Sequence, residues 1–463
     1  MNWESLDVRS LLQAYRREAT TPEAIIAKVY ERIERYADPA VWIYLAPEAD
    51  SLARARALNQ KDSANLPLYG VPFAVKDNID WAGVPTTAGC PEFAYIPEQS
   101  ATVFEKLCAA GAIPIGKTNL DQFATGLVGT RSPYGICRNP FDASYIPGGS
   151  SAGSGVAVAA GLVSFSLGTD TAGSGRVPAA FTNIVGLKPT KGCLSTRGVV
   201  PAVRSLDCVS IFALTCADAE VVLQVASGFD VDDPFSRPRQ SVENLDLNHL
   251  RVGIPSQDYL DFFGNEDAEQ NYQNALAQLQ FLGCQIVTID FQPFAQTASL
   301  LYEGAWVAER TAAVGHFLEQ DHPGINPVVQ KIIMSGKQVS AITAFQDFYR
   351  LRSLQRQAQQ QWEAIDVLAL PTTGTIYTVA QVQAEPFTLN RNLGLYTNFV
   401  NLLDLSAIAV PSGFQANGLP TGITLMANAW YDNFLCNLGG IFHGKLKGTL
   451  GATGIPLSAT IES

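Results

Sequence analysis

The chain has 463 residues, of which 47% are hydrophobic and 16% charged, so it is long enough to bury one or more large cores. Its formal charge is −12 at pH 7, which argues against nucleic acid as a partner because nucleic-acid binding requires a basic surface. The first residues lack a basic segment followed by an apolar run, and no apolar run reaches 18 residues. The sequence therefore predicts neither a signal peptide nor a membrane-spanning helix.

The N-terminal part predicts helices over residues 5–36. Thr21 suits a helix N-cap and Pro22 the first turn, and apolar residues follow at helical spacing at Ile25, Val29 and Ile33. A further helix is expected over residues 49–58. The composition then favours a strand over Leu66–Val75, which ends at Lys76 and a polar turn.

Helices and strands continue to alternate along the chain. Helices are expected over residues 101–110, 155–161, 266–282, 296–315 and 343–364. Strands are expected over residues 112–117, 163–168, 250–254, 285–290, 366–371, 407–411 and 422–426. This alternation predicts an α/β fold on a mostly parallel or mixed sheet. The polar stretch 228–249 is expected to be a surface connection within the same unit.

The cysteines are scattered along the chain. They stand at Cys90, Cys108, Cys137, Cys193, Cys208, Cys216, Cys284 and Cys436, without any C-x-x-C pair. This distribution favours neither a zinc site nor a disulfide framework. We expect reduced thiols in a cytoplasmic protein, with no metal.

One stretch, Pro147–Arg176, is crowded with Gly, Ser and Ala, and between Pro147 and Gly175 its only charged residue is Asp170. The apolar run Val156–Leu167 inside it excludes a flexible linker. Glycines cluster where a backbone turns sharply or approaches a ligand, and clustered N–H groups can stabilise a negative charge. The serines are then either small fillers or nucleophiles.

A serine nucleophile needs a base, and histidine and lysine are both available. The histidines, none of them near the stretch in sequence, are His249, His316, His322 and His443. A G-x-S-x-G elbow would make Ser151 the nucleophile, but such an elbow follows a strand and the residues before Ser151 are loop-like. Lysine is the other base: Lys76 ends a strand, and burial would leave it neutral enough to accept a proton. By residue type alone, a solvated Lys76 remains an alternative.

Taken together, the motifs closely resemble those of the amidase signature family, the Ser–cisSer–Lys amidases. The matching segments are G-G-S-S-A-G-S-G from Gly148, G-T-D-T-A-G-S-G-R-V-P-A-A from Gly168, G-L-K-P-T from Gly186, G-V-P-F-A-V-K-D-N from Gly70, G-K-T-N from Gly116 and R-N-P-F-D from Arg138. The resemblance implies a three-layer α/β/α fold with a central mixed β-sheet flanked by helices. Its motifs are dense over residues 66–216 and sparser elsewhere.

The resemblance assigns roles by position. Ser174 corresponds to the nucleophile, Ser150 to the bridging serine that follows a cis peptide bond, and Lys76 to the base. The N–H groups of Thr171, Ala172 and Gly173, with that of Ser174 itself, correspond to the oxyanion hole. Asp170 and Arg176 correspond to a structural ion pair that holds the loop, and Ser151 is either a network or a filler residue.

Two further segments are similar to the allophanate hydrolases of this family. They are D-P-A-V-W-I-Y from Asp38 and L-L-Y-E-G-A-W-V-A-E-R from Leu300. The second implies that Tyr302 and Arg310 contact the substrate; eight residues are about two helical turns, which predicts one helical face for both. Arg310 suits the allophanate carboxylate, with a solvated surface arginine as the alternative. Gly126 is expected to add a backbone contact to the same substrate.

The resemblance thus implies an enzyme that releases ammonia from allophanate and needs no cofactor. The alternatives are an amidase of other small amides and the amidase component of an aminoacyl-tRNA amidotransferase. We expect residues 1–65 to form a helical region packed on a catalytic core of residues 66–440. Residues 441–463 are expected to form a tail without the further C-terminal domain common in allophanate hydrolases. The family also implies a homodimer.

Overall fold

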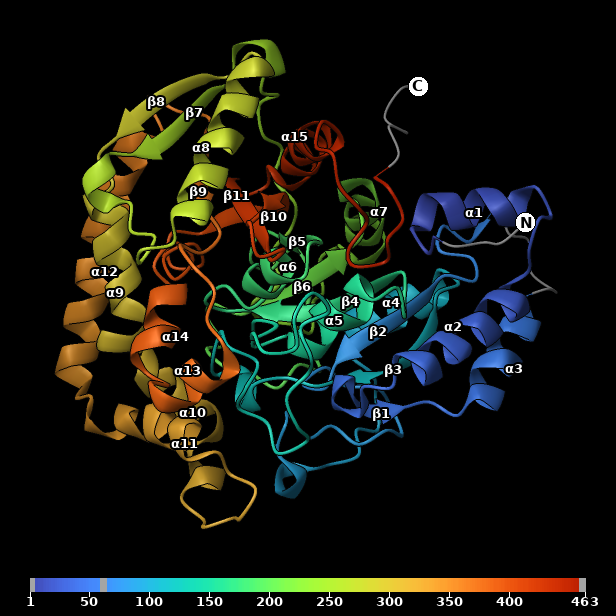
Figure 1. Cartoon of the computed structure of the whole chain (residues 1–463). Helices are drawn as coiled ribbons and strands as arrows, with labels where there is room; N and C mark the ends of the chain where they lie inside the picture. The colour runs from blue at the N-terminus through green and yellow to red at the C-terminus, as the bar shows by residue number, and fades with distance from the viewer. Residues whose placement is uncertain (1–4, 59–64, 458–463) are drawn as a thin grey trace.

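The computed structural model describes residues 5–58 and 65–457, which build an eleven-stranded sheet with helices around it (Figure 1). The strands are β1 (Trp42–Leu45), β2 (Pro72–Lys76), β3 (Ile113–Thr118), β4 (Phe165–Asp170), β5 (Val185–Lys188), β6 (Cys208–Ala213), β7 (Arg251–Pro255), β8 (Gln285–Ile289), β9 (Val367–Pro371), β10 (Leu405–Phe414) and β11 (Pro420–Asn428). The helices are α1 (Val8–Arg16), α2 (Pro22–Tyr36), α3 (Glu48–Leu58), α4 (Thr102–Ala109), α5 (Ala152–Ala159), α6 (Val177–Phe181), α7 (Cys216–Ala226), α8 (Glu266–Phe281), α9 (Gln292–Glu303), α10 (Trp306–Leu318), α11 (Pro327–Met334), α12 (Ala341–Gln361), α13 (Val379–Ala384), α14 (Thr388–Leu393) and α15 (Asp432–Gly444).

The sheet is mixed, with the order β1-β3-β2-β4-β6-β5-β10-β11-β9-β7-β8. Strand β2 pairs in parallel with β3 and β4, and β7 pairs in parallel with β8 and β9. The remaining pairings are antiparallel. Because β2 and β4 are parallel neighbours, their carboxyl ends meet at one edge of the sheet. Lys76 and the loop after Asp170 are therefore brought together there.

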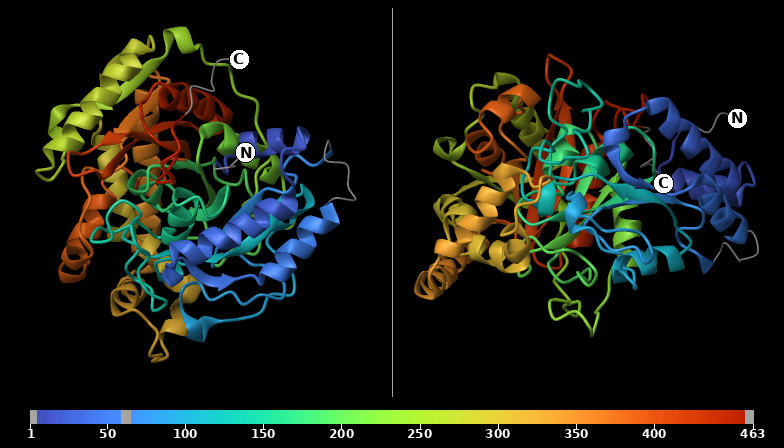
Figure 2. Two further views of the ribbon diagram at one scale, coloured as in Figure 1. Left: turned by 45° about the vertical axis from the view of Figure 1, so that its right-hand side comes forward. Right: turned by 90° about the horizontal axis from the view of Figure 1, so that it is seen from below.

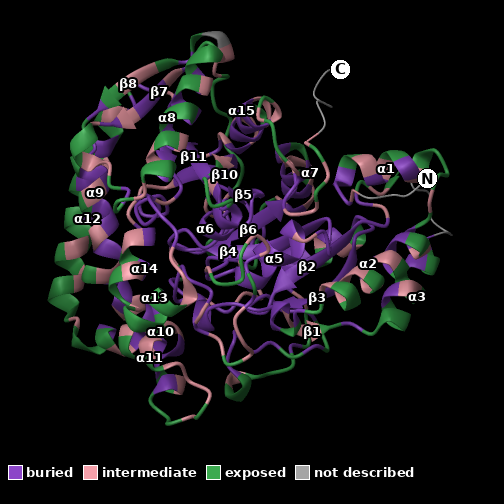
Figure 3. Cartoon of the chain, viewed as in Figure 1, coloured by how far each residue is buried: buried purple, intermediate pink, exposed green. Residues whose placement is uncertain are grey.

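The sheet is buried on both faces, as strand β9 illustrates. Val367 and Ala369 belong to the large core cluster on one face, whereas the alternating residues Leu368 and Leu370 belong to a second cluster. Successive side chains of a strand point to opposite faces, so helices must cover both faces. Figure 2 shows the helices on both sides of the sheet, and Figure 3 shows its central strands buried. The predicted α/β architecture with a flanked mixed sheet is confirmed.

Several local predictions are confirmed where the sequence pattern is strong. The strands expected over 250–254, 285–290 and 366–371 correspond to β7, β8 and β9, and the helix expected over 266–282 corresponds to α8. Thr21 caps α2, accepting a hydrogen bond from the Ala24 N–H at 3.2 Å. Elements with a clear period and a cap were thus recognisable without the tertiary structure.

Other predictions of single elements are wrong. Strand β2 begins at Pro72 and not at Leu66, because the chain turns at Gly70, which has a φ of +68°. The single helix expected over 296–315 is two helices, α9 and α10, with Gly304 in extended backbone between them. Asp347 of α12 accepts a hydrogen bond from the Ala305 N–H at 2.8 Å, which holds the break from a distant part of the chain.

The sequence analysis also missed several elements. Strands β5 and β6 are fully buried and carry no alternation of apolar and polar residues, so the period-2 signal is absent. The N-terminal region is not purely helical, since β1 pairs antiparallel with β3 in the central sheet. Helix α15 extends across residue 440, where the boundary between the catalytic core and the tail was expected. Of the regions expected from the sequence, residues 1–4, 59–64 and 458–463 lie outside the described residues.

Candidate active site

Lys76 is the last residue of β2 and is fully buried. Its Nζ donates hydrogen bonds to Ser150 Oγ at 2.8 Å and to Thr169 Oγ1 at 2.7 Å. Burial lowers the pKa of Lys76 to about 7, against the opposing effect of three nearby carboxylates, those of Asp121, Asp207 and Asp170. A lysine with this pKa is neutral in a large fraction of molecules near neutral pH, so it can accept a proton.

Ser150 and Ser151 have different surroundings. The bond between Gly149 and Ser150 is a cis peptide bond, as the family resemblance implied, and Ser150 Oγ faces Lys76. Ser151 Oγ instead donates to the backbone carbonyl of Thr169 at 3.2 Å and accepts from the Thr169 N–H at 3.3 Å. Ser151 therefore ties the loop to β4, and its hydroxyl is occupied by backbone groups.

Ser174 lies in the loop after β4, only 2% exposed, and its Oγ donates to the carbonyl of Gly126 at 3.4 Å. The N–H groups of Thr171, Ala172 and Ser174 have no hydrogen-bond acceptor among the described residues. The Gly173 N–H, by contrast, donates to Asp170 Oδ1 at 2.8 Å. Three unpaired amides next to a buried serine hydroxyl form a suitable site for a developing oxyanion.

The loop is held by a buried ion pair. Arg176 donates from Nε to Asp170 Oδ2 and from Nη2 to Asp170 Oδ1, both at 2.9 Å, and both side chains are fully buried. Burial alone would raise the pKa of Asp170, but the Arg176 guanidinium outweighs it and holds that pKa below its ordinary value. Asp170 also accepts the Gly175 N–H at 3.0 Å. The bidentate pair and the backbone bonds together define the course of residues 170–176.

Tyr302 and Arg310 come together, but not in the way that the sequence predicted. They lie on α9 and α10, on either side of the helix break, and the Arg310 guanidinium lies over the Tyr302 ring at 5.2 Å. The inference from one continuous helical face was therefore wrong, although the two residues are neighbours. The contact is a cation–π interaction set by the packing of two helices.

Arg310 is 1% exposed, which rules out a solvated surface arginine. Its Nη1 donates to Thr125 Oγ1 at 3.1 Å, whereas Nε and Nη2 have no partner among the described residues. These two nitrogens form the same edge of the guanidinium through which Arg176 binds Asp170 in this protein. A buried arginine with a free bidentate edge suits a carboxylate ligand.

Gly126 lies between Ser174 and the residues that contact Arg310. Its carbonyl accepts the Ser174 hydroxyl, and its neighbour Thr125 accepts from Arg310. A Cβ at Gly126 would meet Asp121 Oδ2 at 2.6 Å, and its φ is +152°, so this position requires glycine. The unpaired edge of Arg310 and the Ser174 hydroxyl are thus linked through two consecutive residues.

The sequence analysis missed several polar residues around the site. Thr169 holds Lys76, and Asp207 accepts a hydrogen bond from Thr171 Oγ1. Asp121 accepts hydrogen bonds from the N–H groups of Val128 and Gly129. Its negative charge also opposes the lowering of the Lys76 pKa. The single available signal was charge: Asp121 is the only charged residue of the segment 118–130, and an acidic residue in a buried segment is uncommon unless it is paired.

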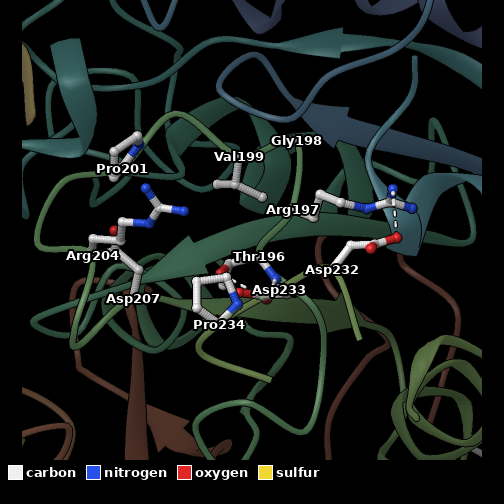
Figure 4. A pocket seen from close by; sticks show the side chains of 10 residues that line it. All are labelled: Thr196, Arg197, Gly198, Val199, Pro201, Arg204, Asp207, Asp232, Asp233 and Pro234. Carbon is white, nitrogen blue, oxygen red and sulfur yellow. Dashed lines mark hydrogen bonds and ion pairs between the residues drawn. The ribbon is translucent and has the colours of Figure 1, made fainter. Parts of the chain in front are cut away.

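A cavity of about 170 Å³ is lined mainly by residues 196–207 and 232–234, with Asp207 on its wall (Figure 4). Figure 4 shows Asp207 and Arg204 at one end and the ion pair of Arg197 with Asp232 at the other, 3.6 Å between Nη1 and Oδ2. None of the three residues Lys76, Ser150 and Ser174 lines it. Asp207 therefore connects this cavity with the loop after β4, through its hydrogen bond with Thr171. Lys76, Ser150 and Ser174, here called the polar centre, are themselves buried.

Two negative observations concern the described residues only. Within 5–58 and 65–457, no group of three or more His, Cys, Asp and Glu side chains is arranged to hold a metal ion. In the same residues, no helix is long and apolar enough to cross a membrane.

The amidase family model matches residues 24–436, which is most of the chain. The chain belongs to the amidase family. The match includes β2, the cis bond and the loop of Ser174, so the polar centre lies inside the region that defines this family.

Among curated relatives, the urea amidolyase of Saccharomyces cerevisiae is 47% identical to this amidase over 403 residues, covering 86% of the chain and 22% of the relative. A glutamyl-tRNA(Gln) amidotransferase component from Chloroflexus aurantiacus is 35% identical over 432 residues, covering 86% of the chain and 88% of the relative. This amidase thus spans about a fifth of the length of the urea amidolyases.

Solved structures of related proteins are also similar to this chain. The Kluyveromyces lactis allophanate hydrolase superimposes with a TM-score of 0.89 at 44% identity, covering 96% of this chain and 72% of that one. The Kluyveromyces lactis urea amidolyase gives a TM-score of 0.92 at 42% identity, covering 99% of this chain and 28% of that one. The amidase fold is therefore shared over nearly the whole chain.

Proposed function

We propose that this amidase hydrolyses allophanate, the carboxylated form of urea, and releases ammonia. The observation that carries the proposal is the buried guanidinium of Arg310, whose Nε–Nη2 edge is unpaired and which contacts Tyr302. A charged donor left unpaired in the interior is costly unless a ligand satisfies it. The similarity to urea amidolyase and allophanate hydrolase supports a small ligand with a carboxylate at this position.

The proposed reaction begins with a proton relay. Neutral Lys76 takes the proton of Ser150 while Ser150 takes the proton of Ser174, and Ser174 Oγ attacks the terminal amide carbonyl carbon. The 2.8 Å hydrogen bond from Lys76 to Ser150 and the pKa of about 7 support Lys76 as this base. Ser151 takes no part in the relay, since its hydroxyl is bonded to the backbone of Thr169.

The negative charge on the carbonyl oxygen is stabilised by the loop after β4. We assign this role to the N–H groups of Thr171, Ala172 and Ser174, which have no acceptor among the described residues. The Gly173 N–H is already bonded to Asp170, so it serves the shape of the loop rather than the oxyanion. Asp170 and Arg176 keep the loop in this shape.

The tetrahedral intermediate then collapses. The C–N bond of the terminal amide breaks, the leaving nitrogen takes a proton from the relay, and ammonia departs. Water next attacks the ester carbonyl on Ser174, giving the free serine and N-carboxycarbamate, which loses carbon dioxide. Arg310, with Tyr302 beside it and Thr125 and Gly126 linking it to Ser174, holds the carboxylate at the far end of the substrate.

A second candidate, the ammonia-donating component of an aminoacyl-tRNA amidotransferase, is favoured by one observation: the chain covers 88% of such a relative at 35% identity. This candidate predicts glutamine as the substrate and dependence on partner proteins. Allophanate hydrolysis by the isolated chain is predicted only by the first proposal.

The cysteines are all free thiols, which supports a reducing compartment such as the cytoplasm.

The test is ammonia release by the purified chain from allophanate, biuret, malonamate, glutamine and a simple aliphatic amide, measured in parallel. The expected result is the highest kcat/KM for allophanate, with malonamate the best of the others because it also carries a carboxylate. Turnover of glutamine without turnover of allophanate would favour the amidotransferase. Equal turnover of charged and uncharged amides would indicate a general small-amide hydrolase.

A further inference from the structure

Arg131 is a buried arginine without a carboxylate partner. Within the described residues, the most deeply buried arginine side chains are those of Arg131, Arg176 and Arg310, at 2%, 0% and 1% exposure. Arg176 pairs with Asp170, whereas neither Arg131 nor Arg310 forms an ion pair with a described carboxylate. Buried charges in proteins are normally paired, because their removal from water is costly. Arg131 and Arg310 are therefore two buried cations that an anionic ligand would neutralise.

These two arginines meet at the same residue, Thr125. Arg131 Nη1 donates a hydrogen bond to the Thr125 carbonyl at 3.0 Å, and Arg310 Nη1 donates to Thr125 Oγ1 at 3.1 Å. The stem of Arg131 also lies beside Gly126, since a Cβ at Gly126 would meet Arg131 Cδ at 3.2 Å. The carbonyl of Gly126 accepts the Ser174 hydroxyl. Arg131 therefore adjoins the two residues that link Ser174 with Arg310.

The hydrogen bonds of the Arg131 guanidinium go to neutral groups. Besides the Thr125 carbonyl, it donates from Nη2 to the Pro386 carbonyl at 2.6 Å, and its Nε has no partner among the described residues. Asp121 binds Arg131 through the backbone N–H, at 2.9 Å, and not through the guanidinium. Carbonyl oxygens accept hydrogen bonds but carry no net charge. These contacts hold the side chain in place and leave its charge without a directly bonded counter-ion.

The two guanidiniums also repel each other. Burial lowers the pKa of Arg131, Asp121 and Tyr302 oppose this effect, and the neighbouring Arg310 lowers the pKa further. Arginine stays protonated in proteins, so both side chains keep their charge. An anion bound beside two like charges in a buried site reduces their repulsion, and a neutral molecule of the same shape does not. The charges of this site therefore favour a ligand that carries a carboxylate.

We propose that Arg131 is a specificity-determining residue, which acts with Arg310 to select amides that carry a carboxylate over neutral ones. Arg131 supplies a second positive charge, and its bond to the Thr125 carbonyl holds the residue whose hydroxyl accepts from Arg310. Allophanate and biuret have nearly the same shape, so charge is the main property by which the site can distinguish them. This proposal rests on the proposed function and adds a residue to its carboxylate contact.

The test is Arg131→Gln, assayed by ammonia release from allophanate, malonamate and biuret. Glutamine removes the charge but keeps an N–H donor for the Thr125 carbonyl. The KM for both anionic substrates should rise roughly tenfold, which is the effect of a unit charge about 10 Å away at an effective dielectric constant of about 20. The KM for biuret should change little. Arg56→Gln is the matched control, because Arg56 is an exposed arginine that pairs with Glu23, and it should leave all three substrates unaffected.

A second variant, Arg131→Lys, keeps the charge and should retain most of the wild-type preference for allophanate over biuret. It decides alone if Arg131→Gln does not fold: a lost preference in the folded lysine variant would overturn the proposal, and a retained one would support it.

A third measurement does not depend on turnover. Malonate should raise the thermal midpoint of the Ser174→Ala chain, whereas malonamide, its neutral counterpart, should not. Adding Arg131→Gln should reduce the shift that malonate causes, and an unchanged shift would overturn the proposal.

The outcomes separate this proposal from the proposed function. Equal losses of folded Arg131→Gln on allophanate and biuret, in an enzyme whose wild type prefers allophanate, would overturn the role of Arg131 alone. A wild-type chain that does not hydrolyse allophanate would overturn both.

Discussion

Arg310→Met tests the substrate assignment most directly. The substitution removes the guanidinium whose Nε and Nη2 are unpaired, and keeps a flexible apolar side chain beside Tyr302. Hydrogen bonds to a charged group contribute about 1.5–3 kcal/mol. At about 1.4 kcal/mol for each factor of ten, the loss in kcat/KM for allophanate should be roughly tenfold to 150-fold.

The assay is ammonia release from allophanate and from biuret, which has the same backbone but an amide in place of the carboxylate. The variant should lose far more on allophanate than on biuret. Arg310→Lys should recover part of the loss, because an ammonium keeps the charge but not the bidentate edge. Tyr302→Phe should keep most activity, since the ring that contacts the guanidinium remains.

The matched control is Arg56→Met, which removes an exposed arginine that pairs with Glu23 on the surface and should leave both substrates unaffected. Circular dichroism and the thermal midpoint show whether Arg310→Met is folded. Equal losses of the folded variant on allophanate and biuret would refute the carboxylate contact. The assignment to allophanate would then rest on similarity alone.

The remaining predictions concern the polar centre. Activity should fall about tenfold per pH unit below pH 7, because the pKa of Lys76 is about 7 and the base must be neutral; an acid limb unchanged in Lys76→Ala would contradict this. Ser174→Ala should abolish ammonia release without changing the thermal midpoint, and retained turnover would remove it as the nucleophile. Ser150→Ala should reduce kcat far more than Ser151→Ala, while the reverse order would favour the G-x-S-x-G elbow. Asp170→Asn should lower the free energy of unfolding in urea by about 3–5 kcal/mol, since it leaves a buried arginine without its carboxylate, and a loss below about 1 kcal/mol would mean that the ion pair does not stabilise the loop.

The sequence alone was sufficient to predict those features that depend on a few consecutive residues. The cap at Thr21 and the period of α8 are contained in a few consecutive residues, and both were predicted. Lys76, Ser150 and Ser174 were assigned by position from the resemblance of the glycine- and serine-rich motifs to the amidase family, whereas residue type alone also allowed a solvated lysine and small filler serines. The structure brings Lys76 and Ser150 into hydrogen-bond contact and places Ser174 in the adjoining loop.

The tertiary structure alone decided the features that depend on distant partners. Asp347 accepts a hydrogen bond from the Ala305 N–H at the break between α9 and α10. The two residues are 42 positions apart in the sequence, so no local pattern predicted the break. The same holds for Asp207, which is placed by the fold against Thr171, and for β6, whose two buried faces erase the alternation of a strand. Periodicity depends on residues that are close together in the sequence, whereas the partners of buried charges and the unpaired edge of Arg310 depend on which elements the fold brings together.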